Sequence, residues 1–196
     1  FNNPNQSLFG IVQGGEYEDL RRHCVEELVK MDFDGYSIGG TSVGEDKKTQ
    51  YKMVRYATSY LPKDKVRYLM GVGDPIDIVE NVCNGVDIFD CVSPTRLARH
   101  GHALTRYGKI NIKNAKYKED FTPVEEGCTC YACQNYTKAY IKHLINCEET
   151  FGARLLSIHN IHYLINLTEE LRSAIKEDRL LKYREEFIKN YYGKLQ

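Results

Sequence analysis

The sequence predicts an α/β fold in which a short parallel sheet is followed by a small metal-binding part and C-terminal helices. Apolar runs alternate with helical patterns through residues 1–94, and crossover helices bring successive strands back in the same direction. These runs end in glycines or, in the last case, in Asp90. Further along, Cys128, Cys130 and Cys133 have the close spacing of thiolates that share a zinc ion.

Length and composition narrow the class of protein. The chain has 196 residues, with 27 Lys plus Arg against 27 Asp plus Glu, so its net charge says nothing about partners. Seven cysteines, an odd number, without a hydrophobic leader favour a reduced, cytoplasmic protein. The apolar runs are too short to span a bilayer. Because the chain begins at Phe1 without an initiator Met, we expect a fragment or a processed product.

Four strands and three helices are expected in the first half. The strands cover residues 8–12, 35–38, 66–70 and 86–89, and the helices cover residues 16–31, 46–60 and 75–84. Pro62 stops the second helix. Asp74 is a good N-cap for the third, Pro75 fits its first position, and Gly85 terminates it.

The helical periodicity predicts which side chains face the sheet. The expected inward positions are Tyr17, Leu20, Cys24, Leu28 and Met31 in the first helix, and Met53, Val54, Ala57 and Tyr60 in the second. Cys24 and Cys83 are expected to be core residues, and Cys147 a structural one.

The expected sheet leaves two architectures open. Four strands cannot close a barrel, because the smallest common parallel barrel has eight. The sheet is therefore either open, or half of a barrel whose other half precedes Phe1. Glycines at three successive strand ends favour a flat ligand lying close to the backbone, although a plain turn explains any single one of them.

Asp90 is the leading catalytic candidate. It lies where the strand over residues 86–89 ends, and chemistry in parallel α/β folds collects at such carboxyl ends. A carboxylate there can act as a nucleophile or as a general base. The alternative is a helix cap or a solvated loop residue.

Residues 95–118 form a basic segment. It contains no Asp or Glu, and histidines and tyrosines are interleaved with its cations. In a chain of net charge zero, this segregation is a local signal for phosphate and hence for nucleic acid. The alternative is a solvated basic face balanced by acids from elsewhere. The cations are Arg96, Arg99, Arg106, Lys109, Lys113, Lys116 and Lys118.

The three clustered cysteines predict a structural zinc site. Thiolates at this spacing repel one another, and a zinc ion relieves the repulsion by binding them tetrahedrally. From the residues alone, the fourth ligand is open between His159 and His162. Unmetalled cysteines or a disulfide are the alternatives.

The remaining chain is expected to be helical. One helix is expected over residues 135–150, and residues 154–195 continue in helical periodicity. Two apolar faces in this region pack on the sheet or on the zinc loop, or serve a partner chain. They are Leu164, Leu167, Leu171 and Ile175, and Leu180, Tyr183, Phe187 and Tyr191.

Several motifs in combination resemble the tRNA-guanine transglycosylase family. They are residues 9–15 (Phe-Gly-Ile-Val-Gln-Gly-Gly), 39–45, 68–73 and 89–96, and the cysteine cluster followed at a distance by His-Asn. The resemblance covers essentially the whole chain. It implies a (β/α)8 barrel with an inserted zinc subdomain, and this chain looks like its C-terminal half. Residues 1–94 would be the last four β/α units, 95–160 the RNA-contacting segment and zinc subdomain, and 161–196 C-terminal helices.

The resemblance also implies an activity. The family exchanges guanine at the anticodon wobble position of certain tRNAs for a 7-deazaguanine precursor of queuosine. Asp90 matches the family nucleophile, which implies a covalent Asp90–ribose intermediate. Residues that match the base-binding positions are Gln13, Gly39, Gly40, Val43 and Met70. Those that match the ligands of one structural Zn²⁺ are Cys128, Cys130, Cys133 and His159.

Two stretches match the family's contacts with the tRNA anticodon loop. The first consists of Gly71, Val72, Gly73, Asp74, Pro75, Ile76 and Asp77. The second consists of Thr95, Arg96, Leu97, Ala98 and Arg99.

The sequence also departs from the family. Thr41 stands where Leu is usual, and His100 where Asn is common. Val43 looks bacterial and favours 7-aminomethyl-7-deazaguanine over queuine. The family's general acid/base would lie before Phe1, so this chain is expected to be inactive alone, and the complete enzyme to be a homodimer. The alternative from another class is a non-catalytic, zinc-stabilised RNA-binding or partner subunit.

Overall fold

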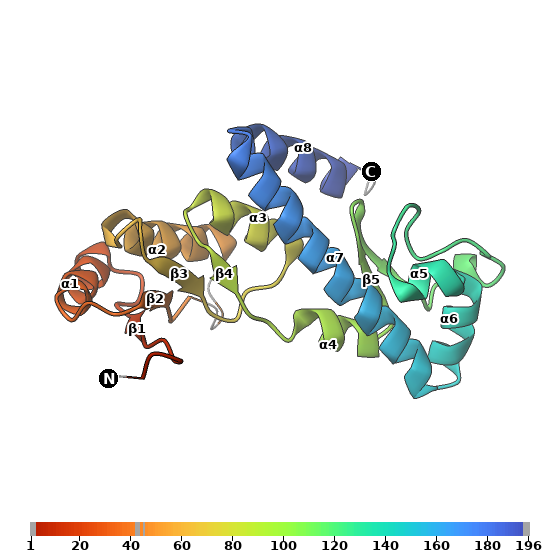
Figure 1. Cartoon of the computed structure of the whole chain (residues 1–196). Helices are drawn as coiled ribbons and strands as arrows, with labels where there is room; N and C mark the ends of the chain where they lie inside the picture. Colours follow the sequence, from red (N-terminus) through yellow and green to blue (C-terminus); the bar gives the residue numbers. More distant parts are fainter. Residues whose placement is uncertain (1–2, 42–43, 45, 194–196) are drawn as a thin grey trace. The chain divides into compact units, whose positions relative to one another are not determined.

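The computed structural model describes residues 3–41, 44 and 46–193. The chain divides into two compact units, residues 1–91 and 92–196 (Figure 1).

The first unit contains the predicted parallel sheet. Its strands are β1 (Phe9–Val12), β2 (Gly35–Ile38), β3 (Val66–Leu69) and β4 (Ile88–Phe89), all parallel and in the order β1-β2-β3-β4. This confirms the four predicted strands. The last strand is shorter than expected: Val86 N–H donates to the carbonyl of Asn81 at the end of α3, and Asp87 N–H is the first to reach β3, at the carbonyl of Arg67.

Three helices connect these strands, as predicted. They are α1 (Glu18–Val29), α2 (Lys47–Tyr60) and α3 (Pro75–Cys83). Asp74 caps α3 by accepting a hydrogen bond from Ile76 N–H at 3.1 Å. Gly85 follows α3 with φ of +88°, a conformation that glycine adopts without strain.

The two faces of the sheet have different surroundings. Val12, Ile38 and Leu69 share one row and are buried against Val54 and Ala57 of α2. The neighbouring row runs through Ile11, Ser37, Tyr68 and Ile88. Its ends, Ile11 and Ile88, are each 45% exposed, so helices cover one face of the sheet and leave the other open.

Helix α1 corrects one predicted face. Tyr17, Leu20 and Met31 were expected to face the sheet but are exposed, and the fully buried side chains are Arg21 and Val25. The helix is rotated because the Arg21 guanidinium donates hydrogen bonds to backbone carbonyls inside the unit. In α2 the prediction holds for Met53, Val54 and Ala57, which are buried, but not for Tyr60, which is exposed.

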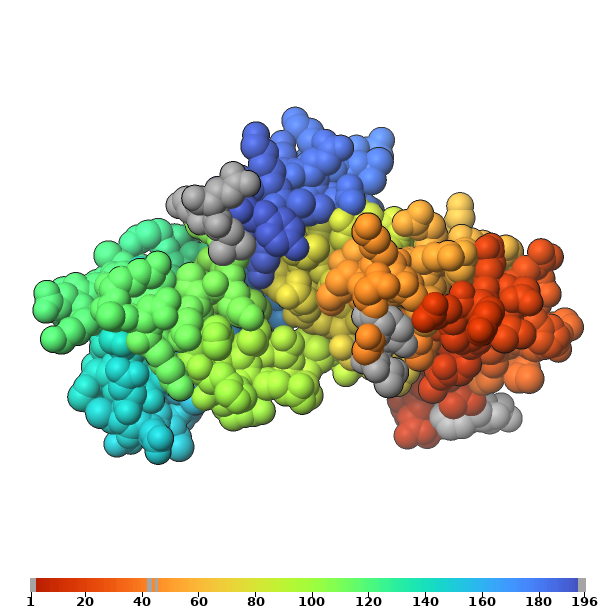
Figure 2. All heavy atoms as spheres, turned by 180° about the vertical axis from the view of Figure 1, so that it is seen from behind, coloured from red at the N-terminus to blue at the C-terminus, as the bar shows by residue number. Residues whose placement is uncertain are grey.

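The second unit combines a hairpin with helices. Its elements are α4 (Ser93–Arg99), β5 (His102–Thr105), β6 (Gly108–Asn111), the short 3₁₀ helix η1 (Ala115–Tyr117), α5 (Tyr131–Asn135), α6 (Lys138–Asn146), α7 (Thr150–Lys176) and α8 (Leu180–Gly193). The antiparallel hairpin β5–β6 lies within the basic segment and was not predicted. Figure 2 shows the hairpin and α6, in green and cyan, as parts of one continuous surface.

The helix predicted over residues 135–150 is present but shorter, as α6 over Lys138–Asn146. Thr137 caps this helix by accepting a hydrogen bond from Tyr140 N–H at 3.3 Å. Glu148, with φ of +58°, then interrupts the helical conformation between α6 and α7. Cys147 lies in this break and is exposed, so the expected structural role is not supported.

The core of the second unit forms around α7. Leu155 and Leu156 are fully buried against Ala98 of α4, Ala103 of β5 and Ile141 of α6. Of the predicted apolar positions farther along α7, Leu167 and Leu171 are buried while Ile175 is exposed. Within the described ranges, no helix combines the length and the apolar character needed to cross a membrane.

Candidate functional site

Asp90 lies at the carboxyl end of β4 with one carboxylate oxygen held in place. Tyr68 Oη donates to Asp90 Oδ1 at 2.6 Å, and Gly71 N–H donates to the same oxygen at 2.9 Å. The bond from Tyr68, followed by that from Gly71, lowers the pKa of Asp90, and slight burial opposes this. The carboxylate is therefore ionised at neutral pH.

Asp90 lines a cavity of about 440 Å³ at the strand ends. Four of the five predicted base-binding residues line the same cavity, namely Gln13, Gly39, Gly40 and Met70. The fifth, Val43, lies outside the described residues. Tyr68 also lines the cavity and was not predicted, because a tyrosine within a strand carries no local signal for a site.

The glycines at the end of β2 leave room for Gln13. A Cβ on Gly39 would lie 2.6 Å from Gln13 Nε2, and one on Gly40 would lie 2.8 Å from Gln13 Oε1. Gly40 also has φ of +63°, which disfavours any larger residue. Only glycine at both positions lets the Gln13 amide keep this place.

Arg21 holds the loops around the cavity and was not predicted. Its side chain is 0% exposed and donates to the carbonyls of Gly15, Gly39 and Gly40 at 2.7, 3.2 and 3.3 Å. These bonds fix the two turns that carry the predicted base-binding residues. The sequence signal that could have indicated Arg21 is its place directly after Leu20, a predicted inward position of the helix.

The first predicted RNA-contacting stretch is mostly buried. Gly71 and Asp74 are exposed, whereas Val72, Gly73, Pro75, Ile76 and Asp77 are buried. The Asp77 carboxylate accepts a hydrogen bond from Tyr51 Oη at 2.7 Å and pairs with Lys47. RNA contact by this stretch stays a prediction, and in the described unit the buried side chains pack or form ion pairs within the protein, so Gly71 and Asp74 are its exposed positions.

The second stretch forms α4. Arg96 and Arg99 are exposed, Thr95 and Leu97 are partly buried, and Ala98 is fully buried in the core. RNA contact by this stretch stays a prediction, for which Arg96 and Arg99 are the exposed side chains, while the side chain of Ala98 packs in the core.

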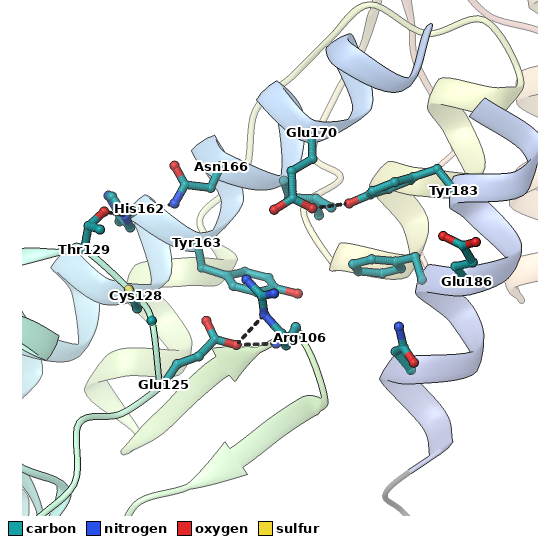
Figure 3. A pocket seen from close by; sticks show the side chains of 14 residues that line it. Arg106, Glu125, Cys128, Thr129, His162, Tyr163, Asn166, Glu170, Tyr183 and Glu186 are labelled. Atoms are coloured by element: carbon teal, nitrogen blue, oxygen red, sulfur yellow. Dashed lines mark hydrogen bonds and ion pairs between the residues drawn. The ribbon is translucent and has the colours of Figure 1, made fainter. Parts of the chain in front are cut away.

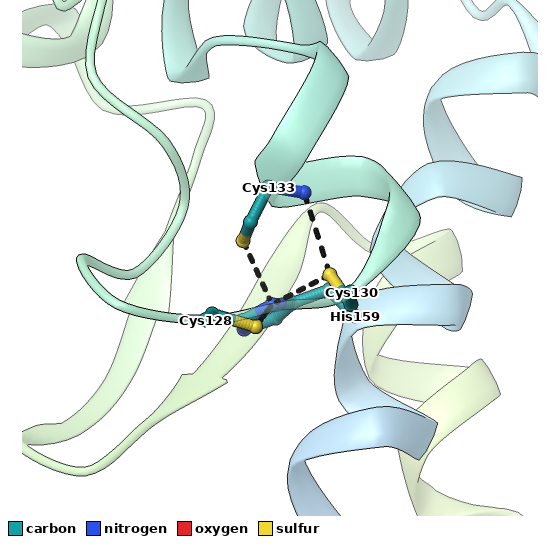
Figure 4. A group of neighbouring side chains, drawn as sticks. All are labelled: Cys128, Cys130, Cys133 and His159. Carbon is teal, nitrogen blue, oxygen red and sulfur yellow. Dashed lines mark hydrogen bonds between the residues drawn. The ribbon is translucent and has the colours of Figure 1, made fainter.

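The four predicted metal ligands come together in the second unit (Figure 4). His159 Nδ1 lies 3.7 Å from Cys128 Sγ, 3.7 Å from Cys130 Sγ and 3.3 Å from Cys133 Sγ. The ligand atoms all lie within 4.8 Å of one another. In a tetrahedral zinc site, bonds of about 2.0–2.3 Å separate neighbouring ligands by about 3.5–3.8 Å. The cluster therefore fits a zinc ion.

Protonation in this cluster is set by its neighbours. Burial lowers the pKa of His159, but hydrogen bonds with Cys128 and Cys130 outweigh it and raise the pKa to about 10. The bond with Cys133 lowers the pKa of Cys130 to about 3. His159 Nε2 donates to the Leu104 carbonyl at 2.8 Å, which turns Nδ1 toward the thiols.

The structure distinguishes the two candidate histidines. His162 Nε2 instead lies 3.2 Å from Thr129 Oγ1 and 2.9 Å from Asn166 Nδ2. His159 is thus the histidine grouped with the thiols.

Comparisons with known proteins agree with this geometry. A family model described as "Queuine tRNA-ribosyltransferase" matches residues 1–193. Curated relatives carry the same name. That of Caldanaerobacter subterraneus subsp. tengcongensis is 56% identical over 192 residues, 98% of this chain and 51% of that protein. Those of Staphylococcus aureus and Macrococcus caseolyticus are 57% and 56% identical over 187 residues, 95% of this chain and 49% of each protein.

This chain spans about half the length of the curated relatives it matches. The family match nevertheless covers both units, including the cavity beside Asp90 and the Cys/His cluster. The chain belongs to the queuine tRNA-ribosyltransferase family.

Proposed function

We propose that this chain takes part in tRNA base exchange, in which guanine at the anticodon wobble position is replaced by a 7-deazaguanine. The observation that carries the proposal is that Asp90 lines one cavity with Gln13, Gly39, Gly40 and Met70. This arrangement puts a carboxylate beside a recess with an amide and backbone groups for a purine-like base.

The chemistry is a double displacement. Asp90 attacks C1′ of the target ribose, the C1′–N9 bond breaks, and its electron pair leaves with guanine, which takes a proton from a general acid. The incoming 7-deazaguanine then loses a proton, its N9 attacks C1′, and the Asp90–C1′ bond breaks to restore the carboxylate. No energy source is needed, because each glycosidic bond is exchanged through a covalent intermediate.

Tyr68 and Gly71 support the nucleophilic role of Asp90. Both donate to Oδ1, so Oδ2 is the oxygen that can approach the sugar carbon. The same two donors stabilise the carboxylate when it returns as a leaving group. We therefore assign Tyr68 as a positioning residue for Asp90.

Gln13 and the apolar wall suit a flat base. The Gln13 amide offers both a donor and an acceptor to a base edge. Ile11 and Met70 line the same cavity and can cover the ring face. The target base must leave its stack to enter, as in other enzymes that act on a base. Among 7-deazaguanines, we propose the 7-aminomethyl compound as the incoming base.

The second unit has the structural and RNA-binding roles in this proposal. Cys128, Cys130, Cys133 and His159 would hold one Zn²⁺, with no ligand position left open for catalysis. The ion would fix the loop before α5 against α7. The exposed Arg96 and Arg99 of α4 would contact phosphates or base edges of the anticodon loop.

The sheet supports placement in a (β/α)8 barrel. Its strands are all parallel and lie side by side in the order of the sequence, as in a segment of a barrel. In a doubly wound sheet, by contrast, the order of the strands reverses partway across the sheet. The open face with Ile11 and Ile88 would then point into the barrel. We also propose that the complete enzyme is a cytoplasmic homodimer, which sedimentation of the full gene product would test.

The decisive experiment is Asp90→Asn in the full-length gene product. The amide keeps the shape of the carboxylate but cannot attack carbon, so incorporation of labelled guanine into tRNA should be lost while tRNA binding remains. Wild-type protein stopped with denaturant should carry a covalent RNA adduct that the variant lacks. Asp64→Asn, at an exposed loop position, is the matched control and should leave exchange unchanged.

Two outcomes would contradict the proposal. Near-normal exchange by Asp90→Asn would remove Asp90 from the mechanism. Tight tRNA binding by wild-type protein without exchange or adduct would instead favour a non-catalytic RNA-binding subunit.

A further inference from the structure

The second unit contains another cavity, which the proposed base exchange does not use. It has a volume of about 340 Å³ and lies between α7, α8 and the turn of the β5–β6 hairpin (Figure 3). This volume is within the range of small-molecule sites. Its lining combines carboxylates with aromatic rings, most of them from the two helices.

A buried hydroxyl in this cavity lacks a partner. Tyr163 is 8% exposed, and its Oη makes no hydrogen bond with the residues that the structure describes. Figure 3 shows the Tyr163 ring directed between Glu125, Arg106 and α8. Because leaving a buried hydroxyl without a hydrogen bond costs free energy, this group favours a bound molecule that supplies one.

The charge of the lining is negative. It includes three glutamates and one arginine. The backbone N–H of Arg106 donates a hydrogen bond to the Glu125 carboxylate at 2.7 Å, and its guanidinium forms an ion pair with the same group at 3.6 Å. Glu170 accepts a hydrogen bond from Tyr183 at 2.7 Å, and Glu186 lies 4.0 Å from Lys182. Glu170 thus has a neutral partner, whereas Glu186 interacts with Lys182 and with Arg179, whose guanidinium lies 5.9 Å from the centre of the Tyr183 ring. Neither of these two cations lines the cavity, where three carboxylates face one arginine.

Aromatic rings lie between these carboxylates. Tyr183 and Phe187 are stacked along α8 with centroids 6.1 Å apart, and both line the cavity. Aromatic faces attract ammonium groups and also pack against methylene chains. Among the described residues, the group suited to a metal ion is the Cys/His cluster, so these glutamates do not converge on one ion.

We propose that this cavity binds an organic polycation of the polyamine class. Separate ammonium groups would pair with Glu170 and Glu186, the methylene chain would cross Tyr183 and Phe187, and Tyr163 Oη would accept a hydrogen bond from an ammonium. A ligand with spaced charges matches acceptors that are spread along the cavity better than a single ion does.

The test is calorimetric titration of spermidine into the full-length, metal-containing protein without RNA. We expect saturable binding with one molecule per chain. Glu170→Gln and Glu186→Gln should each weaken binding about threefold, and the double variant about tenfold, as for partly exposed ion pairs. Tyr163→Phe should weaken binding without lowering the Tm of the ligand-free protein, because it removes a hydroxyl that has no partner there.

Glu185→Gln is the matched control, since it removes an exposed carboxylate of α8 that does not line the cavity. Its affinity for spermidine should equal that of wild type. Absence of saturable binding, or equal weakening by Glu185→Gln and Glu170→Gln, would overturn the proposal. Glu186 lies at the rim with a side chain 60% exposed, so its variant tests the site even if a deeper substitution disturbs folding.

Discussion

Two hydrogen bonds to a single carboxylate oxygen set the acidity of Asp90. Its carboxylate is exposed in the described chain, yet the hydrogen bonds from Tyr68 and from Gly71 N–H lower its pKa. A nucleophilic carboxylate must be ionised, so activity should fall only when the pH drops through this lowered pKa.

Tyr68→Phe should therefore change the pH profile of base exchange. Without the phenol, the pKa of Asp90 rises toward its ordinary value, so the acid limb of the rate should move to higher pH. The maximal rate should fall about two- to tenfold, the range expected for one hydrogen bond. The measurement is exchange rate against pH. Tyr17→Phe, at an exposed position, is the control, and an unmoved acid limb in Tyr68→Phe would argue against coupling to Asp90.

Arg96 and Arg99 give a residue-level test of RNA binding. Arg96→Ala and Arg99→Ala should each weaken tRNA binding and reduce the slope of log affinity against log salt by about 1, as for one lost phosphate contact. Arg154→Ala removes an exposed arginine of α7 and should leave the slope unchanged. Equal slopes for all three variants would exclude a phosphate contact by α4.

At the scale of elements, Asn160 joins three segments of the second unit. Its Oδ1 accepts from Leu104 N–H at 2.8 Å, and its Nδ2 donates to the carbonyls of Pro94 and His102 at 3.0 and 3.1 Å. One fully buried side chain of α7 thus fixes both α4 and the hairpin. It follows His159 directly, so the same turn of helix holds the cluster and the hairpin.

Asn160→Ala should destabilise the protein strongly. The substitution leaves a buried N–H and two carbonyls without partners, so we expect a loss of about 2–4 kcal/mol in the free energy of unfolding. Denaturant unfolding followed by circular dichroism measures it. Asn166→Ala, at an exposed position of the same helix, should cost far less, and equal losses would contradict the role of Asn160.

At the scale of the whole molecule, the two units have separate cores. The buried apolar cluster of the first unit, which includes Val12 and Val54, shares no residue with that of the second, which includes Ala98 and Leu155. The thiol cluster belongs to the second core through Cys130 and Cys133. The metal should therefore stabilise one unit in particular.

Zinc removal should loosen the second unit. Protein purified without added zinc should contain about one zinc per chain, because three thiols and an imidazole form a closed site. Chelation should speed hydrogen exchange in α5 and α7 but not in β1–β3. Zinc should be lost more readily as pH falls, because protons compete at His159, whose metal-free pKa is about 10, and at the thiols.

Cysteine variants provide the controls for zinc. Cys130→Ser should lose the metal, whereas Cys147→Ser, which changes an exposed cysteine outside the cluster, should keep it. A wild-type protein that is folded but contains no metal would contradict the assignment of these residues as zinc ligands.

Local signals in the sequence sufficed for the alternation of strands and helices in the first unit. Short apolar runs, N-caps such as Asp74 and terminators such as Gly85 act over a few residues, so they can be read without knowing the fold. The spacing of Cys128, Cys130 and Cys133 was sufficient to predict a metal site for the same reason. These signals located Asp90 at a strand end and the three thiols in one loop.

Tertiary structure decided the features that depend on distant residues. Arg21 turns α1 because its partners, the carbonyls of Gly39 and Gly40, follow the next strand. Tyr68 meets Asp90 only because β3 pairs with β4. The choice of His159 over His162 depends on how α7 lies against a loop about 30 residues earlier. Such contacts are set by packing, which no local pattern encodes.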